Sequence, residues 1–169
     1  MTAEPDGEII SISKYMPTRY AGDAQETRAL NALIVLMRAS DAFLMALQRD
    51  VAARRLTLSQ FGVLEALLHV GPLCQGELAV KLLRSGASVT AVVDGLEKRS
   101  LVARQRSEPD RRFVRVALTA KGRRLIEAAF PGHARTVARL FRVLTDGEQD
   151  ELRRLCRKLG TSIAQGSEV

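Results

Sequence analysis

Residues 98–124 read KRSLVARQRSEPDRRFVRVALTAKGRR, and the pattern inside this stretch decides the fold. Apolar side chains alternate with other residues from Val114 to Leu118, and an extended run leads from Leu101 to Arg106. Alternation with a period of two is typical of a β-strand. Residues 107–112 between the two runs include a proline and an aspartate, both of which favour turns. The stretch therefore predicts a β-hairpin with a charged tip.

The same stretch carries most of the net charge of the chain. Its ten basic and two acidic residues give a net charge of +8. The other 16 basic and 17 acidic residues give −1, so the formal net charge of +7 for the 169 residues is a local property. A concentrated basic patch favours a polyanionic partner such as DNA.

Three helical patterns precede the predicted hairpin. Thr57-Leu58-Ser59-Gln60 is a capping box that predicts a helix to about His69, and Gly71-Pro72 ends it. A short helix is expected over residues 75–83, and a third runs from Ser85 to Arg99. Two short helices and a third helix before a basic hairpin predict a winged helix-turn-helix, whose third helix enters the major groove of DNA.

Longer amphipathic patterns flank this module on both sides. One covers residues 28 to about 53, and Thr119 is expected to cap another that Pro131-Gly132 kinks or breaks. A second capping box starts at Thr145, and the apolar stripe of the last helix is Leu152, Leu155, Cys156, Leu159 and Ile163. Nothing else in a chain of this size would cover the first and last stripes, so they predict a dimerisation layer.

The predicted fold is mainly α with a small β-hairpin. Its expected parts are an arm over residues 1–27, a first dimerisation helix over 28–55, a winged helix-turn-helix domain over 56–119, C-terminal dimerisation helices over 120–163 and a tail over 164–169. Hydrophobic residues make up 46% of the chain and aromatic residues only 4%, which favours helices packed through aliphatic side chains.

Composition also predicts the compartment. Two cysteines are too few for a disulfide framework and fit a reducing environment. The acidic start of the chain does not suit a signal peptide, and no apolar run reaches the roughly 18 residues of a membrane span. We therefore expect a cytoplasmic protein without a membrane partner.

The start of the third helix supplies the candidate base contacts. Ser88 and Thr90 lie off its apolar stripe and can hydrogen-bond base edges, although no residue there offers bidentate readout. Whether these two side chains touch bases or are ordinary exposed polar residues is left open by the sequence. Gln75, Arg84 and Ser85 are the candidate phosphate contacts that fix the register on DNA.

The tip of the hairpin supplies the candidate shape readers. Arg111 or Arg112 can enter a narrow minor groove, where the negative potential is highest, and Asp110 can hold the guanidinium in line. Shape reading would then carry much of the DNA specificity. A hairpin that is merely charged and solvated is the alternative.

Several of these motifs together resemble the MarR family of bacterial transcriptional regulators. The resemblance rests on LTLSQF at 56–61, GPL at 71–73, ELA at 77–79, VDGLEKR at 93–99, DRR at 110–112 and LTAKG at 118–122. It covers about Leu30 to Leu159. The first 25 or so residues lie outside it.

The resemblance implies a homodimer that binds a pseudo-palindromic operator. It also implies repression of nearby genes until a small molecule, commonly phenolic, or an oxidant weakens DNA binding. By the same resemblance, Arg112 enters the minor groove beside Asp110. One departure limits the transfer, because many relatives carry a long polar residue early in the recognition helix where this chain has Gly86, Ala87 and Ala91.

The remaining reactive residues have alternative interpretations. Cys74, at the expected N-cap of a helix, is either a redox sensor or an inert small side chain, while Cys156 is expected in the core or dimer seam. His69 and His133 lack partners at metal-ligand spacing, so we expect no metal, no cofactor and no catalytic residue. A winged helix used for protein or RNA contacts is the alternative outside DNA binding.

No ligand residues are assigned from the sequence. The possible lining of an effector pocket is equally good core, and it consists of Met37, Phe43, Met45, Phe61 and Phe141.

Overall fold

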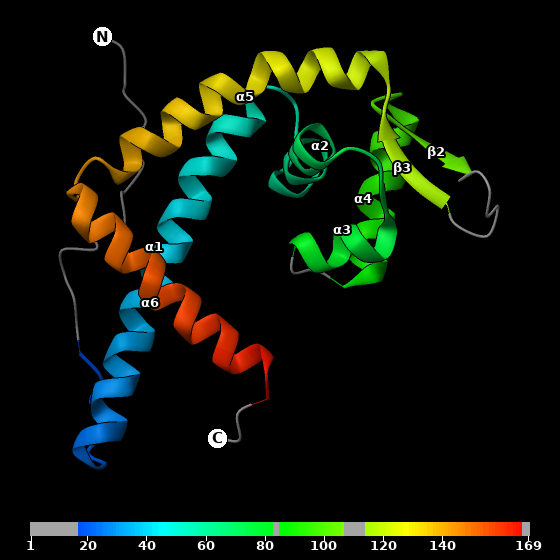
Figure 1. Ribbon diagram of the computed structural model, residues 1–169. Coiled ribbons are helices and arrows are strands. Elements are labelled where there is room, and N and C mark those ends of the chain that lie inside the picture. The colour runs from blue at the N-terminus through cyan, green and yellow to red at the C-terminus, as the bar shows by residue number, and fades with distance from the viewer. Residues whose placement is uncertain (1–16, 83–84, 107–113, 167–169) are drawn as a thin grey trace, which may run out of the picture. The chain divides into compact units, whose positions relative to one another are not determined.

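The computed structural model describes residues 17–82, 85–106 and 114–166 (Figure 1). The chain forms two compact units, Met1–Ala46 and Leu47–Val169. The first unit holds most of one long helix. The second unit holds the end of that helix and all the other elements, including the whole predicted DNA-binding module.

Helix α1 (Ala24–Ala52) begins before the predicted start at Arg28. Asp23 explains the earlier start, because its carboxylate accepts the backbone N–H groups of Gln25 and Glu26 at 2.7 and 2.8 Å. Among the described residues, α1 is the one helix with the length and composition of a membrane span, with a mean hydropathy of 1.6 over its most apolar part. This corrects the expectation that no stretch reaches such a length.

Helix α2 (Leu58–Val70) starts as the sequence predicts. The Thr57 hydroxyl accepts the Gln60 N–H at 3.2 Å, and the Gln60 side chain accepts the Thr57 N–H at 3.2 Å. This reciprocal capping box satisfies two backbone donors that the helix cannot pair. The helix ends at Gly71, whose φ of 91° is a conformation that suits glycine.

The centre of the second unit is a small antiparallel sheet with short helices beside it. The elements are β1 (Leu73–Cys74), α3 (Gln75–Leu82), α4 (Gly86–Lys98), β2 (Val102–Arg106) and β3 (Val114–Leu118). The hairpin of β2 and β3 is confirmed, with Val102 opposite Leu118 and Arg106 opposite Val114. The strand order is β1-β3-β2. Strand β1 was not predicted, because two residues cannot show an alternation and their partner, β3, lies far along the chain.

Helix α5 (Ala120–Phe141) is held against the end of α4. Thr119 caps α5 by accepting the Gly122 N–H at 3.0 Å, and its hydroxyl also donates to the Ser100 carbonyl at 2.8 Å. A Cβ atom at Gly122 would lie only 1.8 Å from the Leu101 carbonyl oxygen, so this approach requires glycine. The helix continues through Pro131, so of the two outcomes predicted there, a kink or a break, the break is excluded. Proline removes one backbone donor but does not force an end when neighbouring turns hold the helix.

Helix α6 (Asp146–Ala164) begins with the second predicted capping box. The Thr145 hydroxyl accepts the Glu148 N–H at 3.4 Å, and the Glu148 carboxylate accepts the Thr145 N–H at 2.8 Å. The bond from the Thr145 N–H, with a second one from the Thr145 hydroxyl to the carboxylate at 2.9 Å, holds the pKa of Glu148 below its usual range. No residue of α6 is buried, and Ile163 is 70% exposed. The helix therefore forms without covering its apolar stripe.

The core lies between Val51 and Ala129 and consists almost wholly of aliphatic side chains. It joins the last turn of α1 to α2, α3, α4, the sheet and the first half of α5. Its largest fully buried side chains are Phe61, Leu64, Leu67, Leu78, Leu96, Leu101 and Ile126. Such a core makes the winged helix-turn-helix complete within one chain.

Candidate nucleic-acid interface

Helix α4 presents one face to the core and the other to solvent. Val89, Val93 and Leu96 are buried, whereas Ser88 in the first turns is exposed. Ser85 is the N-cap, and its hydroxyl accepts the Ser88 N–H at 3.3 Å. The helix therefore packs against the core on one face, while its N-terminal turn is accessible to a partner.

The two candidate base-contacting residues differ in what they offer. The Thr90 hydroxyl donates to the Gly86 carbonyl at 3.0 Å, and its side chain is partly buried. That bond occupies its only donor hydrogen, so the Thr90 hydroxyl can only accept a hydrogen bond from a partner. The Ser88 side chain is exposed and keeps its hydroxyl available. Gln75, the first residue of α3, is half-buried.

Arg104 connects α4 to the hairpin, a role that was not predicted from the sequence. Its guanidinium donates to Asp94 at 2.6 Å and to Glu97, and its backbone N–H donates to Glu97 at 3.1 Å. The hydrogen bond with Asp94 is the main cause that raises the pKa of Arg104. These bonds hold α4 and β2 at one angle. The sequence does hold a signal for this contact, because Asp94 and Glu97 are three residues apart and place two carboxylates on one helix face.

A second arginine fastens the other end of α4. The Arg99 guanidinium donates to the Arg55 carbonyl at 2.7 Å and to the Gln60 side chain at 3.3 Å. The Lys121 ammonium in turn donates to the Arg99 carbonyl at 2.8 Å. The C-terminal end of α4 is thus tied by hydrogen bonds to the start of α2 and to α5.

Four predicted DNA contacts lie outside the described residues. They are Arg84 before α4 and the tip residues Asp110, Arg111 and Arg112. The described strands set where the tip starts, because the last register pair, Arg106 with Val114, closes the ladder just before it. Their roles in DNA binding stay predictions.

Cys74 is the N-cap of α3 in a third capping box. Its sulfur accepts the Glu77 N–H at 3.4 Å, and the Glu77 carboxylate accepts the Cys74 N–H at 2.7 Å. The backbone bond from Cys74 is the main cause that holds the pKa of Glu77 below its usual range. The thiol does here what serine or threonine does in other caps. This geometry supports the structural interpretation of Cys74 without testing its redox chemistry.

Both histidines have structural partners. The His69 ring meets Phe130 edge-on at 4.7 Å, and His133 Nδ1 lies 2.9 Å from an Asp50 carboxylate oxygen. Thr136 also donates to Asp50 at 3.1 Å. Within the ranges that the structure describes, no group of three or more potential ligands could hold a metal ion.

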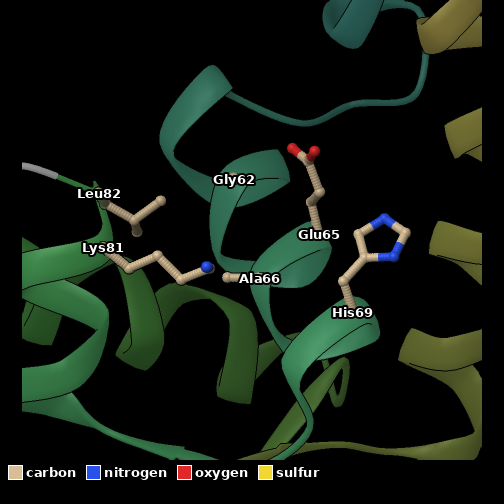
Figure 2. A pocket seen from close by; sticks show the side chains of 6 residues that line it. All are labelled: Gly62, Glu65, Ala66, His69, Lys81 and Leu82. Carbon is tan, nitrogen blue, oxygen red and sulfur yellow. The ribbon is translucent and has the colours of Figure 1, made fainter. Parts of the chain in front are cut away.

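An open pocket of about 330 Å³ lies between α2 and α3. Its lining is Gly62, Glu65, Ala66, His69, Lys81 and Leu82. Figure 2 shows the Lys81 ammonium extending from α3 toward Ala66 of α2. Of the residues suggested as effector lining by the sequence, none lines this pocket. The lining carries one ammonium group, from Lys81, and one carboxylate, from Glu65.

Comparisons with known proteins agree with this geometry. The sequence profile of the MarR family matches residues 56–112. The HTH-type transcriptional regulator MhqR of Bacillus subtilis (strain 168) is 30% identical over 138 residues, which cover 82% of this chain and 95% of that protein. Such coverage extends the similarity well beyond the DNA-binding module.

Solved structures share the fold. AbsC, a MarR family transcriptional regulator from Streptomyces coelicolor, has a TM-score of 0.77 at 21% identity and covers 88% of this chain and 99% of its own. BpsR of Bordetella bronchiseptica has a TM-score of 0.69 at 29% identity, with 76% of this chain and 98% of its own covered. The BpsR structure concerns the mechanism by which 6-hydroxynicotinic acid regulates the DNA binding of that protein.

Proposed function

The chain belongs to the MarR family and is a DNA-binding transcriptional regulator, not an enzyme; we propose that it works in the cytoplasm as a homodimeric repressor. The observation that carries the proposal is helix α4, whose one face is locked into the core while Ser88 on the other stays exposed. In a helix-turn-helix, such a face lies in the major groove.

DNA recognition is divided between α4 and the hairpin tip. Ser88 contacts a base edge, and the Thr90 methyl contacts a thymine methyl, so base readout is modest. Gln75, Arg84 and Ser85 hold phosphates, which fixes the register. The tip then reads the shape of the flanking minor grooves. This division follows from the small residues at the start of α4 and the charge of the tip.

The tip residues carry the strongest DNA contacts in this proposal. Arg112, oriented by Asp110, enters the minor groove, and Arg111 holds an adjacent phosphate. The support is the sequence of the tip and the position of β2 and β3, which end at its base.

A second copy of the chain covers the exposed apolar faces of α1 and α6. Leu33, Met37, Leu155, Leu159 and Ile163 are each about half exposed or more. Burial of apolar surface drives association, and soluble monomers rarely keep such faces open. The same pairing accounts for the apolar composition of α1 without a membrane. Two copies would place two α4 helices about one DNA turn apart, as a pseudo-palindrome requires.

The effector in this proposal is a hydroxylated aromatic carboxylate bound between α2 and α3. Lys81 pairs with the carboxylate, Gly62 and Ala66 leave room for the ring, and Glu65 or His69 bonds the hydroxyl. The regulation of BpsR by 6-hydroxynicotinic acid supports this chemical class. Because α3 packs directly before α4, an occupied pocket would shift the recognition helix.

Binding to genome fragments tests the DNA-binding proposal. The purified protein is mixed with fragments at about 150 mM salt, where non-specific binding is weak. We expect a few fragments to be retained, each with one palindromic site. Arg112→Ala should lose most of this binding and Ser88→Ala should relax preference at one base pair per half-site. Retention of all fragments equally, or unchanged binding by Arg112→Ala, would contradict the proposal.

The effector proposal has its own test. 6-Hydroxynicotinic acid is titrated into wild type, Lys81→Met and the matched control Lys98→Met, whose lysine is exposed away from the pocket. Loss of a charge-assisted pair should weaken binding about tenfold in Lys81→Met only. Equal binding by all three proteins would exclude Lys81 as the carboxylate partner.

A further inference from the structure

The basic stretch at residues 98–124 divides between two surfaces of the module. Part of it forms the hairpin, but Lys121 and Arg124 belong to the first turns of α5. There they share one helix face with cations outside the stretch, and the complete set, here named the α5 stripe, is Lys121, Arg124, Arg135, Arg139 and Arg142. All five side chains are exposed.

Helical geometry places these five cations on one face. At about 100° per residue, they fall within an arc of about 60° and extend over about 32 Å. The opposite face holds the buried Ile126 and Ala129. Ala128 and Pro131 lie between the cations and are small or uncharged, so nothing bulky separates the stripe from a partner.

The charges of the stripe are not compensated by carboxylates. Glu127 is the one acidic residue of α5, and it pairs with Arg123 at 3.5 Å on another face. No carboxylate of the described residues forms a salt bridge with Arg124, Arg135 or Arg139, and the same is true of Arg142. The Lys121 ammonium donates only to a carbonyl, which leaves its charge unpaired.

The stripe starts at the end of α4 that points away from the proposed base contacts. Lys121 bonds the Arg99 carbonyl and Thr119 bonds the Ser100 carbonyl, both just beyond the C-terminus of α4. Figure 1 shows α5 leaving from this end of α4. Ser88 lies near the other end, so a duplex seated on the N-terminal turn leaves the stripe free.

We propose that the α5 stripe is a second polyanion-binding surface, and that its occupant is the phosphate backbone of a second stretch of duplex DNA. Four of its five cations are arginines, whose planar fork matches a phosphate better than an ammonium does. Its length of about 32 Å is close to one turn of B-form DNA, about 34 Å. The stripe has no large apolar side chain that would insert into a lipid surface. One regulator would thereby hold two DNA segments together.

A two-duplex capture experiment tests this proposal. The protein is bound to an immobilised 40-base-pair duplex, and a fluorescent 40-base-pair duplex of unrelated random sequence is added at about 100 mM salt, where backbone contacts still hold. We expect wild type to capture the second duplex. The variant R124Q/R135Q/R139Q/R142Q should capture about tenfold less, with a shallower salt dependence, because each lost phosphate contact removes about 0.9 from the slope. Its binding to the first duplex should change less than about twofold.

The matched control keeps the charge, as R124K/R135K/R139K/R142K. It should capture the second duplex nearly as well as wild type, and all three proteins should show the same thermal midpoint. Capture by the glutamine variant at the wild-type level, or no capture by wild type, would overturn the proposal. So would an equal loss of both duplexes, since the stripe would then belong to a single DNA surface.

Two further arms separate this proposal from other occupants and from operator binding. In the first arm, wild type and the glutamine variant are compared for retention on polyglutamate and on phosphatidylserine vesicles. If retention differs between them but duplex capture does not, the stripe belongs to another partner and the proposal is overturned. If wild type does not hold the first duplex, the regulator proposal fails. A direct titration of both proteins with free duplex then still decides the stripe, because only the stripe differs between them.

Discussion

The winged-helix module and helix α6 carry the same local sequence signals, but the apolar side chains are buried in the module and exposed in α6. Helices α2 and α6 both start with a threonine capping box and repeat leucines at helical spacing. In α2 the repeat is covered, and Leu64 is 0% exposed, whereas Leu155 of α6 is 48% exposed. Local sequence is thus enough to form either helix. Burial depends on a neighbour, which in our proposal a second copy supplies to α6.

The largest expected effect concerns the module, which should not tolerate a change at its tightest contact. Gly122→Ala forces a Cβ atom against the Leu101 carbonyl and should lower the free energy of unfolding by about 3–5 kcal/mol. Urea denaturation measures this. The matched control is Gly147→Ala in the first turn of α6, where nothing lies within 4 Å of the added atom. The control should be neutral or slightly stabilising, and equal losses in both would refute the contrast.

The next effect concerns α6, where a charge should break association and leave the fold intact. Leu155→Asp with Leu159→Asp removes two leucines that each contribute about 1.5 kcal/mol or more when buried, which weakens the dimer about a hundredfold or more. Sedimentation measures the mass and circular dichroism the helix content. Thr161→Asp, on the opposite face of α6, should stay dimeric. If the double variant stays dimeric, the apolar face of α6 is not the dimer interface.

A smaller effect tests the junction between α1 and α5, where the module meets the longer helices. Burial alone would raise the pKa of Asp50, but hydrogen bonds from His133 and Thr136 and the charge of Arg54 outweigh it and lower the pKa. The stabilisation is therefore complete above the ordinary Asp pKa of 3.8 and is lost as the pH falls through the depressed folded value.

Asp50→Asn should accordingly cost about 1–3 kcal/mol near pH 7 and progressively less toward pH 3. Denaturation curves over that range measure the difference from wild type. Asp41→Asn, an exposed position of α1, serves as the control with no such trend. A constant difference at every pH would exclude the ionised carboxylate as the cause.

The smallest effect concerns Cys74, whose thiol does the work of a cap. Cys74→Ser should change stability by less than about 0.5 kcal/mol, while Cys74→Ala should cost about 1 kcal/mol because the Glu77 N–H loses its acceptor. Mobility shifts before and after peroxide treatment test the redox alternative. Oxidant-sensitive DNA binding that disappears in Cys74→Ser would establish the sensor, and no sensitivity would leave the cap as its role.

The features that the sequence predicted well are those decided by neighbouring residues. The capping boxes at Thr57 and Thr145, the stop at Gly71 and the alternation over β3 each depend on a few adjacent side chains. Strand β1 depends on a distant partner and was missed. Whether Pro131 kinks or breaks α5 depends on packing of the flanking turns, so the local signal left both outcomes open.

The functional site shows the same division. The start of α4 near Ser85 and the position of Ser88 off the apolar stripe followed from the helix pattern. The bridge from Arg104 to Asp94 and Glu97 crosses from strand to helix, and the α5 stripe combines residues inside the basic stretch 98–124 with residues beyond it. Both required knowing which elements lie side by side.

In our proposal, two copies of the chain pair through their terminal helices and so place two winged-helix modules on DNA. Hydroxyl-radical footprinting of a retained genome fragment tests this arrangement most directly. We predict two protected patches about 10 base pairs apart, related by a dyad, with weaker protection of the flanking minor grooves. The L155D/L159D variant should lose the paired pattern at the same protein concentration. A single patch without a dyad in wild type, or the same pair of patches in the variant, would contradict the account.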